Sequence, residues 1–144
     1  MTERTLIIVK PDAFQAGRTD AILEAFGNHG FRMLTSKQVS LSRSEAEGFY
    51  AEHRGKPFFD DLVAFMTSGS CVVAVLEADN AVQVARALVG ATNPSQAAEG
   101  TLRRSFGSTT TRNAVHASDS LQSAQREVSF FFPDLAPSAG AGGN

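Results

Sequence analysis

Short runs of β-branched and apolar residues alternate along this chain with segments of helical spacing, and this alternation constrains the fold more than any other feature. Residues 5–9 read TLIIV and stop at Lys10-Pro11-Asp12, which predicts a buried strand. Further strands are expected at 31–41, 72–76 and 128–132, and helices at 19–28, 42–53, 58–66, 80–89 and 118–126. This order predicts an α/β (α+β) sandwich of the ferredoxin-like βαββαβ type, with a four-stranded antiparallel sheet and helices covering one face. Such a fold hosts many functions and decides none of them.

A single domain is expected over residues 1–132, because 144 residues are enough for one substantial core. Residues 133–144 are low in complexity and are expected to be poorly ordered. Between them, residues 90–112 form a long polar stretch with little periodicity. A compact domain rarely carries so long a loop without a functional reason.

The composition excludes several classes of protein. A net charge of −2 argues against a dedicated nucleic-acid binder, which usually carries a basic excess. No apolar run approaches the roughly 20 residues that cross a bilayer, and the N-terminus shows no signal-peptide pattern. The single cysteine, Cys71, leads an apolar run and is expected to be a buried, inert thiol. These features predict a cytoplasmic protein without membrane contact.

The chain has no phosphate-binding glycine loop, no dinucleotide glycine fingerprint and no Cys/His cluster with metal-ligand spacing. What remains is a set of cations and hydroxyls, each with an ordinary structural explanation when taken alone. Lys10 can be a solvated strand end, and Arg86 can cover the core with its stem. The set comprises Lys10, Arg86, Thr92, Arg103, Arg104, Arg112 and the segment around His116.

His116 lies between the apolar pair Ala114-Val115 and the run Ser118-Asp119-Ser120. That run is typical of a helix start, where side-chain oxygens and free backbone N–H groups gather. A histidine held there can be a nucleophile, a base, a ligand or an ordinary residue near a helix cap. These residues alone leave the alternatives open.

Several segments together resemble the nucleoside diphosphate kinase family in its short bacterial form. They are residues 6–12 (LIIVKPD), 57–59 (PFF), 90–94 (GATNP), 100–103 (GTLR) and 113–120 (NAVHASDS), and their order and spacing are kept over roughly residues 5–132. The resemblance implies transfer of the γ-phosphate of a nucleoside triphosphate, typically ATP, to nucleoside diphosphates. It also implies ping-pong kinetics through a phosphohistidine, with broad base and sugar tolerance.

The resemblance assigns a role to each matching residue. His116 matches the nucleophile, Glu127 the carboxylate that orients it, Ser118 the hydroxyl linked to that carboxylate, and Tyr50 a residue beside the nucleophile. A carboxylate on one imidazole nitrogen fixes the tautomer and leaves the other nitrogen free to attack.

The nucleotide contacts follow in the same way. Arg86, Thr92 and Arg103 match phosphate-contacting residues. Lys10 matches a residue shared between a sugar hydroxyl and the terminal phosphate, and Asn113 matches a sugar-hydroxyl contact. Two guanidinium groups and a hydroxyl make a suitable phosphate clamp.

Phe58 matches the aromatic residue on which the base stacks, with Leu62 beside it. Stacking accepts every base, because each has a π-face. The implied cofactor is Mg²⁺, which enters with the nucleotide and is bound mainly by phosphate oxygens and water. Asp119 matches a carboxylate that touches the ion through water, although a first-turn charge favouring the helix dipole explains it equally well.

Two departures from the family bear on these expectations. Ala117 stands where the family usually has glycine, and a positive φ there would cost on the order of 1–2 kcal/mol. The short C-terminus leaves both tetramer and hexamer open for the expected homo-oligomer, with the tetramer slightly favoured.

Two rival functions remain. A phosphohistidine carrier protein would be phosphorylated by a partner enzyme and would leave Phe58, Lys10 and Asn113 without a role. A catalytically silent regulatory or nucleic-acid-binding member of the family would not need the complete set of site residues.

Overall fold

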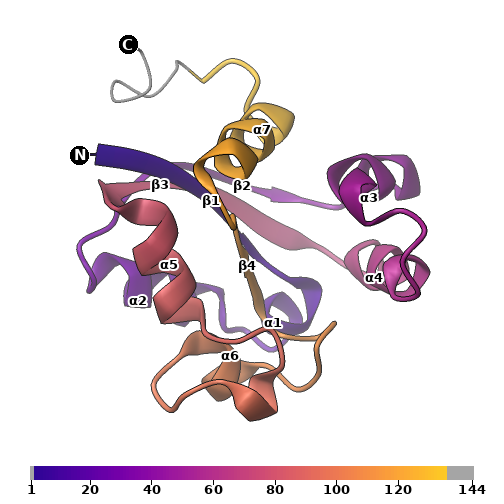
Figure 1. Cartoon of the computed structure of the whole chain (residues 1–144), viewed down its shortest axis with the longest axis horizontal. Helices are drawn as coiled ribbons and strands as arrows, with labels where there is room; N and C mark the ends of the chain where they lie inside the picture. Colours follow the sequence, from indigo (N-terminus) through magenta and orange to yellow (C-terminus); the bar gives the residue numbers. More distant parts are fainter. Residues whose placement is uncertain (1, 136–144) are drawn as a thin grey trace.

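Residues 2–135 are described by the computed structural model of the chain, and their framework is a four-stranded antiparallel sheet (Figure 1). The strand order is β2-β3-β1-β4, as in a ferredoxin-like fold. The strands are β1 (Thr2–Val9), β2 (Arg32–Val39), β3 (Cys71–Asp79) and β4 (Val115–Ala117). β1 pairs along its whole length with β3, and its end pairs with β4, where Ile8 lies opposite His116. The expected fold class is confirmed.

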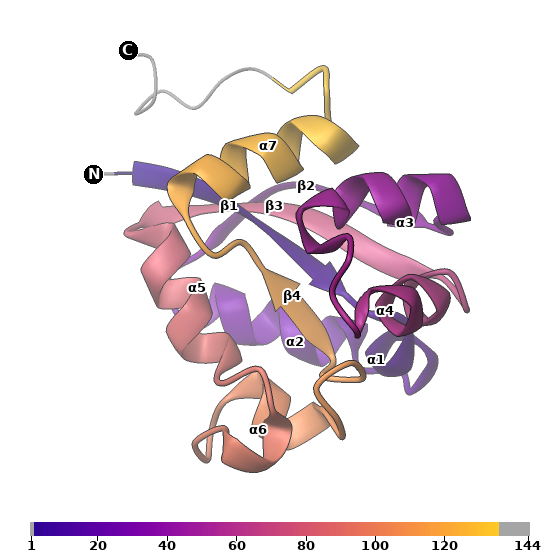
Figure 2. The same ribbon diagram turned by 45° about the vertical axis from the view of Figure 1, so that its right-hand side comes forward.

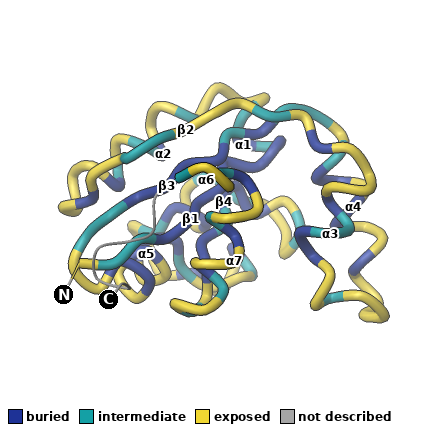
Figure 3. Tube along the Cα trace, turned by 90° about the horizontal axis from the view of Figure 1, so that it is seen from above, coloured by how far each residue is buried: buried dark blue, intermediate teal, exposed yellow. Residues whose placement is uncertain are grey.

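Helices cover both faces of the sheet, so the expectation of one covered face was wrong (Figure 2). On β1, Ile7 and Val9 belong to one core cluster, whereas Leu6 and Ile8 belong to the other. A strand buried on both sides needs a layer on each side. The first cluster takes in α2 (Thr19–Gly27) and α5 (Ala81–Val89), and the second takes in α3 (Arg43–Phe49), α4 (Phe59–Met66) and α7 (Leu121–Phe131). Burial is therefore deepest along β1 and β3, while β2 and α2 form a largely exposed edge (Figure 3).

The C-terminal part of the fold differs most from the prediction. Of residues 128–132, expected as the fourth strand, 128–131 form the end of α7 and Phe132 is its C-cap, and the fourth strand is the three-residue β4 around His116. The buried residues of α7 are Ala124, Glu127 and Phe131, which have the spacing of one helix face. Ser120 caps this helix by accepting a hydrogen bond from the Ser123 N–H at 3.0 Å. The predicted helix start is thus confirmed within three residues.

The long stretch at residues 90–112 is more regular than expected. It contains the 3₁₀ helix η2 (Pro94–Gln96) and the helix α6 (Leu102–Phe106), capped by Asn93 and Thr101. Two further short helices follow β1 and α3 along the chain, namely α1 (Pro11–Gln15) and η1 (Ala51–His53). Of the expected C-terminal tail, residues 136–144 lie outside the described part of the chain.

Candidate functional site

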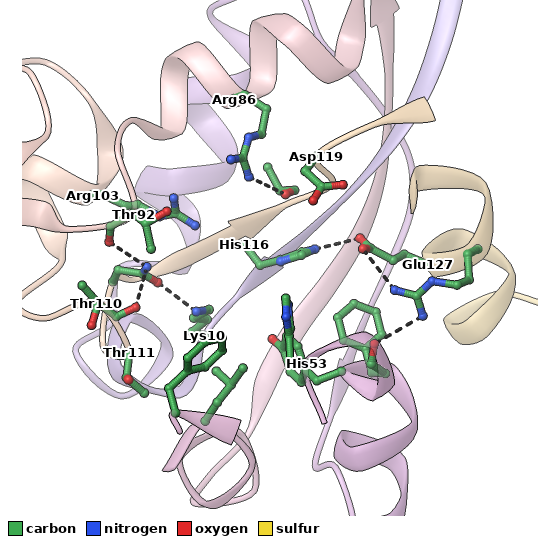
Figure 4. A pocket seen from close by; sticks show the side chains of 17 residues that line it. Lys10, His53, Arg86, Thr92, Arg103, Thr110, Thr111, His116, Asp119 and Glu127 are labelled. Atoms are coloured by element: carbon green, nitrogen blue, oxygen red, sulfur yellow. Dashed lines mark hydrogen bonds and ion pairs between the residues drawn. The ribbon is translucent and has the colours of Figure 1, made fainter. Parts of the chain in front are cut away.

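A cavity of about 460 Å³ opens where the end of β1, the 90–112 segment, β4 and α7 meet (Figure 4). It brings together every predicted site residue except Ser118, which is fully buried behind its wall. The predicted residues that line it are Lys10, Tyr50, Phe58, Leu62, Arg86, Thr92, Arg103, Asn113, His116, Asp119 and Glu127. Arg104 and Arg112, also considered from the sequence, are not among its lining residues.

His116 is held by a carboxylate on one side of its ring. Its Nε2 lies 2.7 Å from Oε1 of Glu127, and the same oxygen accepts a hydrogen bond from Ser118 Oγ at 2.8 Å. Ser118 is fixed in turn by β1, because its Oγ accepts the Leu6 N–H at 3.2 Å. With Nε2 donating to the carboxylate, Nδ1 keeps its lone pair and is the nitrogen able to attack an electrophile.

The backbone just before His116 makes a tight turn. Ala114 has φ +75°, and the Val115 N–H donates to the carbonyl of Asn113 at 2.9 Å, which is the bond of a γ-turn. Such a conformation persists only where its surroundings enforce it. Here Asp12 Oδ2 accepts the Ala114 N–H at 3.1 Å, and the Lys10 N–H donates to the Ala114 carbonyl at 2.9 Å.

Ala117 does not have a strained backbone, so the conformational cost expected for an alanine where the family usually has glycine does not arise. It is a strand residue of β4, paired with Ile7 and almost fully buried. Among residues 2–135, the only non-glycine residues with positive φ are Asn80 and Ala114. The conformational cost therefore falls three residues earlier than expected.

The two arginines of the predicted phosphate clamp are anchored on carbonyls that flank His116. Arg103 donates to the Val115 carbonyl through Nε at 3.3 Å and Nη2 at 3.1 Å, and to the Gly90 carbonyl through Nη1 at 3.2 Å. Arg86 donates through Nη1 to the Ala117 carbonyl at 3.3 Å. Burial, followed by repulsion from Arg86, lowers the pKa of Arg103 to about 10. Two fixed cations thus face the histidine.

Lys10 and Asn113 form a buried pair beside these cations. Lys10 Nζ donates to Asn113 Oδ1 at 2.8 Å, while Asn113 Nδ2 donates to the carbonyls of Thr92 and Thr110, each at 3.0 Å. Both amide protons of Asn113 are therefore used, and only Oδ1 has capacity left for a ligand hydroxyl. Burial and the charge of Arg103 lower the pKa of Lys10 to about 7.

Aromatic side chains line the opposite wall of the cavity. Phe58 is 44% exposed at the mouth, while Leu62 and Tyr50 are buried. The Tyr50 hydroxyl has no hydrogen-bond partner among the described residues, and burial raises its pKa. His53 joins the two rings, with centroids 6.2 Å from Tyr50 and 5.4 Å from Phe58.

Sequence reasoning missed several residues at this site. Asp12 holds the turn at Ala114, and Phe49, His53, Thr110, Thr111 and Arg126 also line the cavity. None of them belongs to a local pattern that carries chemistry. Only the helix start at Pro11, with an acidic residue in the first turn, was a recognisable signal near Asp12.

Three comparisons with known proteins agree with this geometry. A family model described as nucleoside diphosphate kinase matches residues 3–136. A protein from Syntrophotalea carbinolica named nucleoside diphosphate kinase is 56% identical over 133 residues, which are 92% of this chain and 97% of that protein. The crystal structure of the Aquifex aeolicus nucleoside diphosphate kinase has a TM-score of 0.90 at 44% identity and covers 92% of this chain and 96% of its own. That of the Encephalitozoon cuniculi enzyme, in an apo cubic form, has a TM-score of 0.90 at 34% identity and covers 95% and 94%.

The fold and the cation-lined cavity therefore define a phosphotransferase. The chain belongs to the nucleoside diphosphate kinase family. The activity of this family is transfer of the γ-phosphate of a nucleoside triphosphate to a nucleoside diphosphate by a ping-pong mechanism.

Proposed function

We propose that His116 is the residue that carries the phosphoryl group between the two nucleotides. The observation that carries this proposal is the 2.7 Å contact between Nε2 and Glu127 inside a cavity lined by cations. In the first half-reaction, the Nδ1 lone pair forms a bond to the γ-phosphorus of the donor. The bond from that phosphorus to the bridging oxygen breaks, and its electron pair leaves with the nucleoside diphosphate. The second half-reaction runs the same steps backwards with the acceptor.

Charge stabilisation in this scheme comes from residues that are already fixed. Arg86 and Arg103 are each bonded to a backbone carbonyl and lie at the cavity wall with Thr92. Donors that need no reorganisation stabilise developing charge best, and losing one typically costs about 3–4 kcal/mol in other enzymes. We assign these three residues, with Lys10, to the phosphates.

The nucleoside is proposed to occupy the other end of the cavity. The exposed ring of Phe58, next to the buried Leu62, offers a face on which any base can stack. The remaining acceptor capacity of Asn113 Oδ1 and the ammonium of Lys10 suit the sugar hydroxyls. Tyr50 completes the wall beside His116. This arrangement supports broad base and sugar tolerance.

Mg²⁺ is proposed to enter with the nucleotide. Among residues 2–135, no group of three or more His, Cys, Asp or Glu side chains is placed to hold a metal ion. An ion held mainly by phosphate oxygens and water needs one carboxylate at most, and Asp119 lines the cavity. Hydrogen bonding to the Ser123 side chain is the main reason that the pKa of Asp119 lies below its usual value. When bound, the ion would neutralise charge on the phosphate oxygens.

We also propose a homo-oligomer, with the tetramer ahead of the hexamer. The support is the outer edge of β2, where Met33 is 49% exposed beside a small apolar hollow. An open strand edge with apolar surface favours pairing with another chain. Sedimentation of the wild type and of Met33→Lys would test this, because a smaller species is expected for the variant and an unchanged one would exclude this edge.

A cytoplasmic location is proposed from the lone, buried Cys71. No helix within residues 2–135 has the length and apolarity to span a membrane.

The central proposal is tested with γ-labelled ATP and the purified protein. We expect an acid-labile phosphoenzyme that donates its label to several nucleoside diphosphates, and loss of both labelling and turnover in His116→Ala. His29→Ala, which replaces an exposed histidine just beyond the C-terminal end of α2, is the matched control and should label normally. Full activity of His116→Ala would exclude this nucleophile. A protein labelled only by a partner enzyme would instead be a phosphohistidine carrier.

A further inference from the structure

At the wall of the cavity, one side chain, Arg126, contacts both groups that hold the ring of His116. The first group is Glu127, whose Oε1 meets Nε2. The second is Phe49, whose ring lies edge-on to the imidazole with centroids 5.5 Å apart. Arg126 Nη2 lies 3.6 Å from Glu127 Oε2, and the guanidinium carbon lies 5.8 Å from the centre of the Phe49 ring. Figure 4 shows the first of these contacts, between His116 and Glu127.

Arg126 is itself fixed from a second part of the chain. Its Nη1 donates to the Phe49 carbonyl at the end of α3 at 3.3 Å, and its Nη2 lies 3.7 Å from Glu52 Oε1 on η1. The guanidinium therefore connects α7, which supplies Glu127, to the α3–η1 segment, which supplies Phe49. The Glu52 contact is on the outside, where both side chains are largely open to solvent, whereas Glu127 is buried.

The two carboxylate oxygens of Glu127 have different partners. Oε1 accepts from His116 and from Ser118, and Oε2 faces Arg126. A buried carboxylate whose second oxygen meets a cation is held with the plane of its oxygens in one orientation. That plane sets the direction in which Nε2–H points, and hence the direction of the attacking Nδ1 lone pair. Small errors in the direction of a reacting group are costly in rate.

We infer that Arg126 is a positioning residue for phosphoryl transfer, acting on His116 through Glu127 and Phe49. This inference rests on the proposed role of His116 as the nucleophile. Arg126 does not touch the reacting atoms, so its loss should lower kcat without changing the KM for nucleotides. Because the contact with Glu127 is half-exposed, the expected loss is modest, about threefold to tenfold.

The test compares four variants with the wild type by quench-flow measurement of phosphoenzyme formation and by steady-state kinetics. Arg126→Met keeps the stem over Phe49 and removes the charge, so we expect the loss in kcat and in phosphorylation rate. Arg126→Lys keeps the charge and should recover most of both rates. Glu52→Gln removes only the outer partner and should behave as the wild type. Arg43→Met, another exposed arginine in ion pairs with Glu47 and Asp60, is the matched control and should also be normal.

Each contrary result identifies a different error. Wild-type rates in Arg126→Met, or a lysine variant no better than methionine, would overturn the inference. A loss in Glu52→Gln equal to that in Arg126→Met would show that Arg126 merely ties α7 to η1. A raised KM with unchanged kcat would make it a nucleotide contact. Nitrogen NMR of the imidazole adds a readout independent of turnover, since Arg126→Met should reduce the population with the proton on Nε2. Turnover by His116→Ala would refute the proposed function instead, whatever Arg126 does.

Discussion

Replacement of Lys10 by methionine should remove a large pH dependence from the stability of the fold. Lys10 is only 5% exposed, and burial followed by repulsion from Arg103 lowers its pKa from 10.5 to about 7. Methionine has nearly the same length and no charge. The variant gives up the hydrogen bond to Asn113 Oδ1, which shifts its stability by about 1 kcal/mol at every pH.

The sign follows from proton binding in the two states. Between pH 7 and 10.5 the unfolded chain holds a proton on Lys10 that the folded chain has released, so the wild type gains stability as the pH rises through this window. Below pH 7 both states are protonated, and the full penalty, roughly 5 kcal/mol, is constant. From pH 7 to pH 9 the relief amounts to about 2 kcal/mol.

The measurement is urea unfolding of wild type and Lys10→Met at pH 6, 7, 8 and 9, at one protein concentration. The difference in unfolding free energy between the two proteins should be flat from pH 6 to 7 and then move by about 2 kcal/mol in favour of the wild type by pH 9. Lys56→Met, which removes an exposed ammonium, is the control for the loss of a lysine charge as such. A pH-independent difference for Lys10→Met would refute the reasoning that Lys10 is desolvated in the folded protein.

Substitutions at three positions, two of them with a control variant, test other parts of the site. Ala114→Val adds a branched side chain at a fully buried residue with φ +75° and should destabilise the fold by about 2–3 kcal/mol in thermal unfolding. Ala114→Gly should change the stability by no more than about 1 kcal/mol. Equal losses in the two variants would contradict backbone strain at Ala114. Gly90→Ala places a Cβ 2.6 Å from Thr101 Oγ1 and should cost at least about 2 kcal/mol and reduce activity, because the Gly90 carbonyl holds Arg103. Gly17→Ala, with a similar φ but open space, should cost only about 1 kcal/mol and leave turnover unchanged. Phe58→Ala should raise nucleotide KM by roughly tenfold, in line with about 1–3 kcal/mol per stacked base, and an unchanged KM would exclude stacking on this ring.

The sequence predicted those elements whose patterns are local. The buried run of β1 and the capping box at Ser42, where Glu45 and Ser42 exchange hydrogen bonds, lie where expected. Residues 128–132 failed because VSFFF has strand-like composition, whereas its spacing continues the face of α7 set by Ala124 and Glu127. The prediction missed β4 for a different reason. Three residues are too few for a periodic signal, and the strand exists through its pairing with β1 more than a hundred residues earlier.

The residues of the site also separate into those that sequence motifs predict and those that only the fold brings together. The family resemblance assigned the site residues, and the cavity gathers all of those assigned except the buried Ser118. Apart from Glu127 and Ser118, which the resemblance supplied, residues that act by supporting others were not predicted, because their partners lie far along the chain or across a helix. Asp12 contacts Ala114 only because α1 packs against the start of β4, and Arg126 contacts Phe49 only because α7 lies over the end of α3. Such contacts are products of the fold and leave no mark in local spacing.

The anchoring of the two arginines also gives a reason for the proposed nucleophile, His116, to lie on a strand. Arg103 and Arg86 bind the carbonyls of Val115 and Ala117, the two neighbours of His116 on β4. The cations and the imidazole are therefore attached to the same three residues, and any shift of β4 moves them together. The separation between the proposed nucleophile and the charges it needs then depends on these hydrogen bonds, which are 3.1–3.3 Å long, instead of on the packing of separate elements. Because preorganised charge stabilises a transition state without reorganisation at the moment of reaction, this attachment keeps the site ready for both half-reactions.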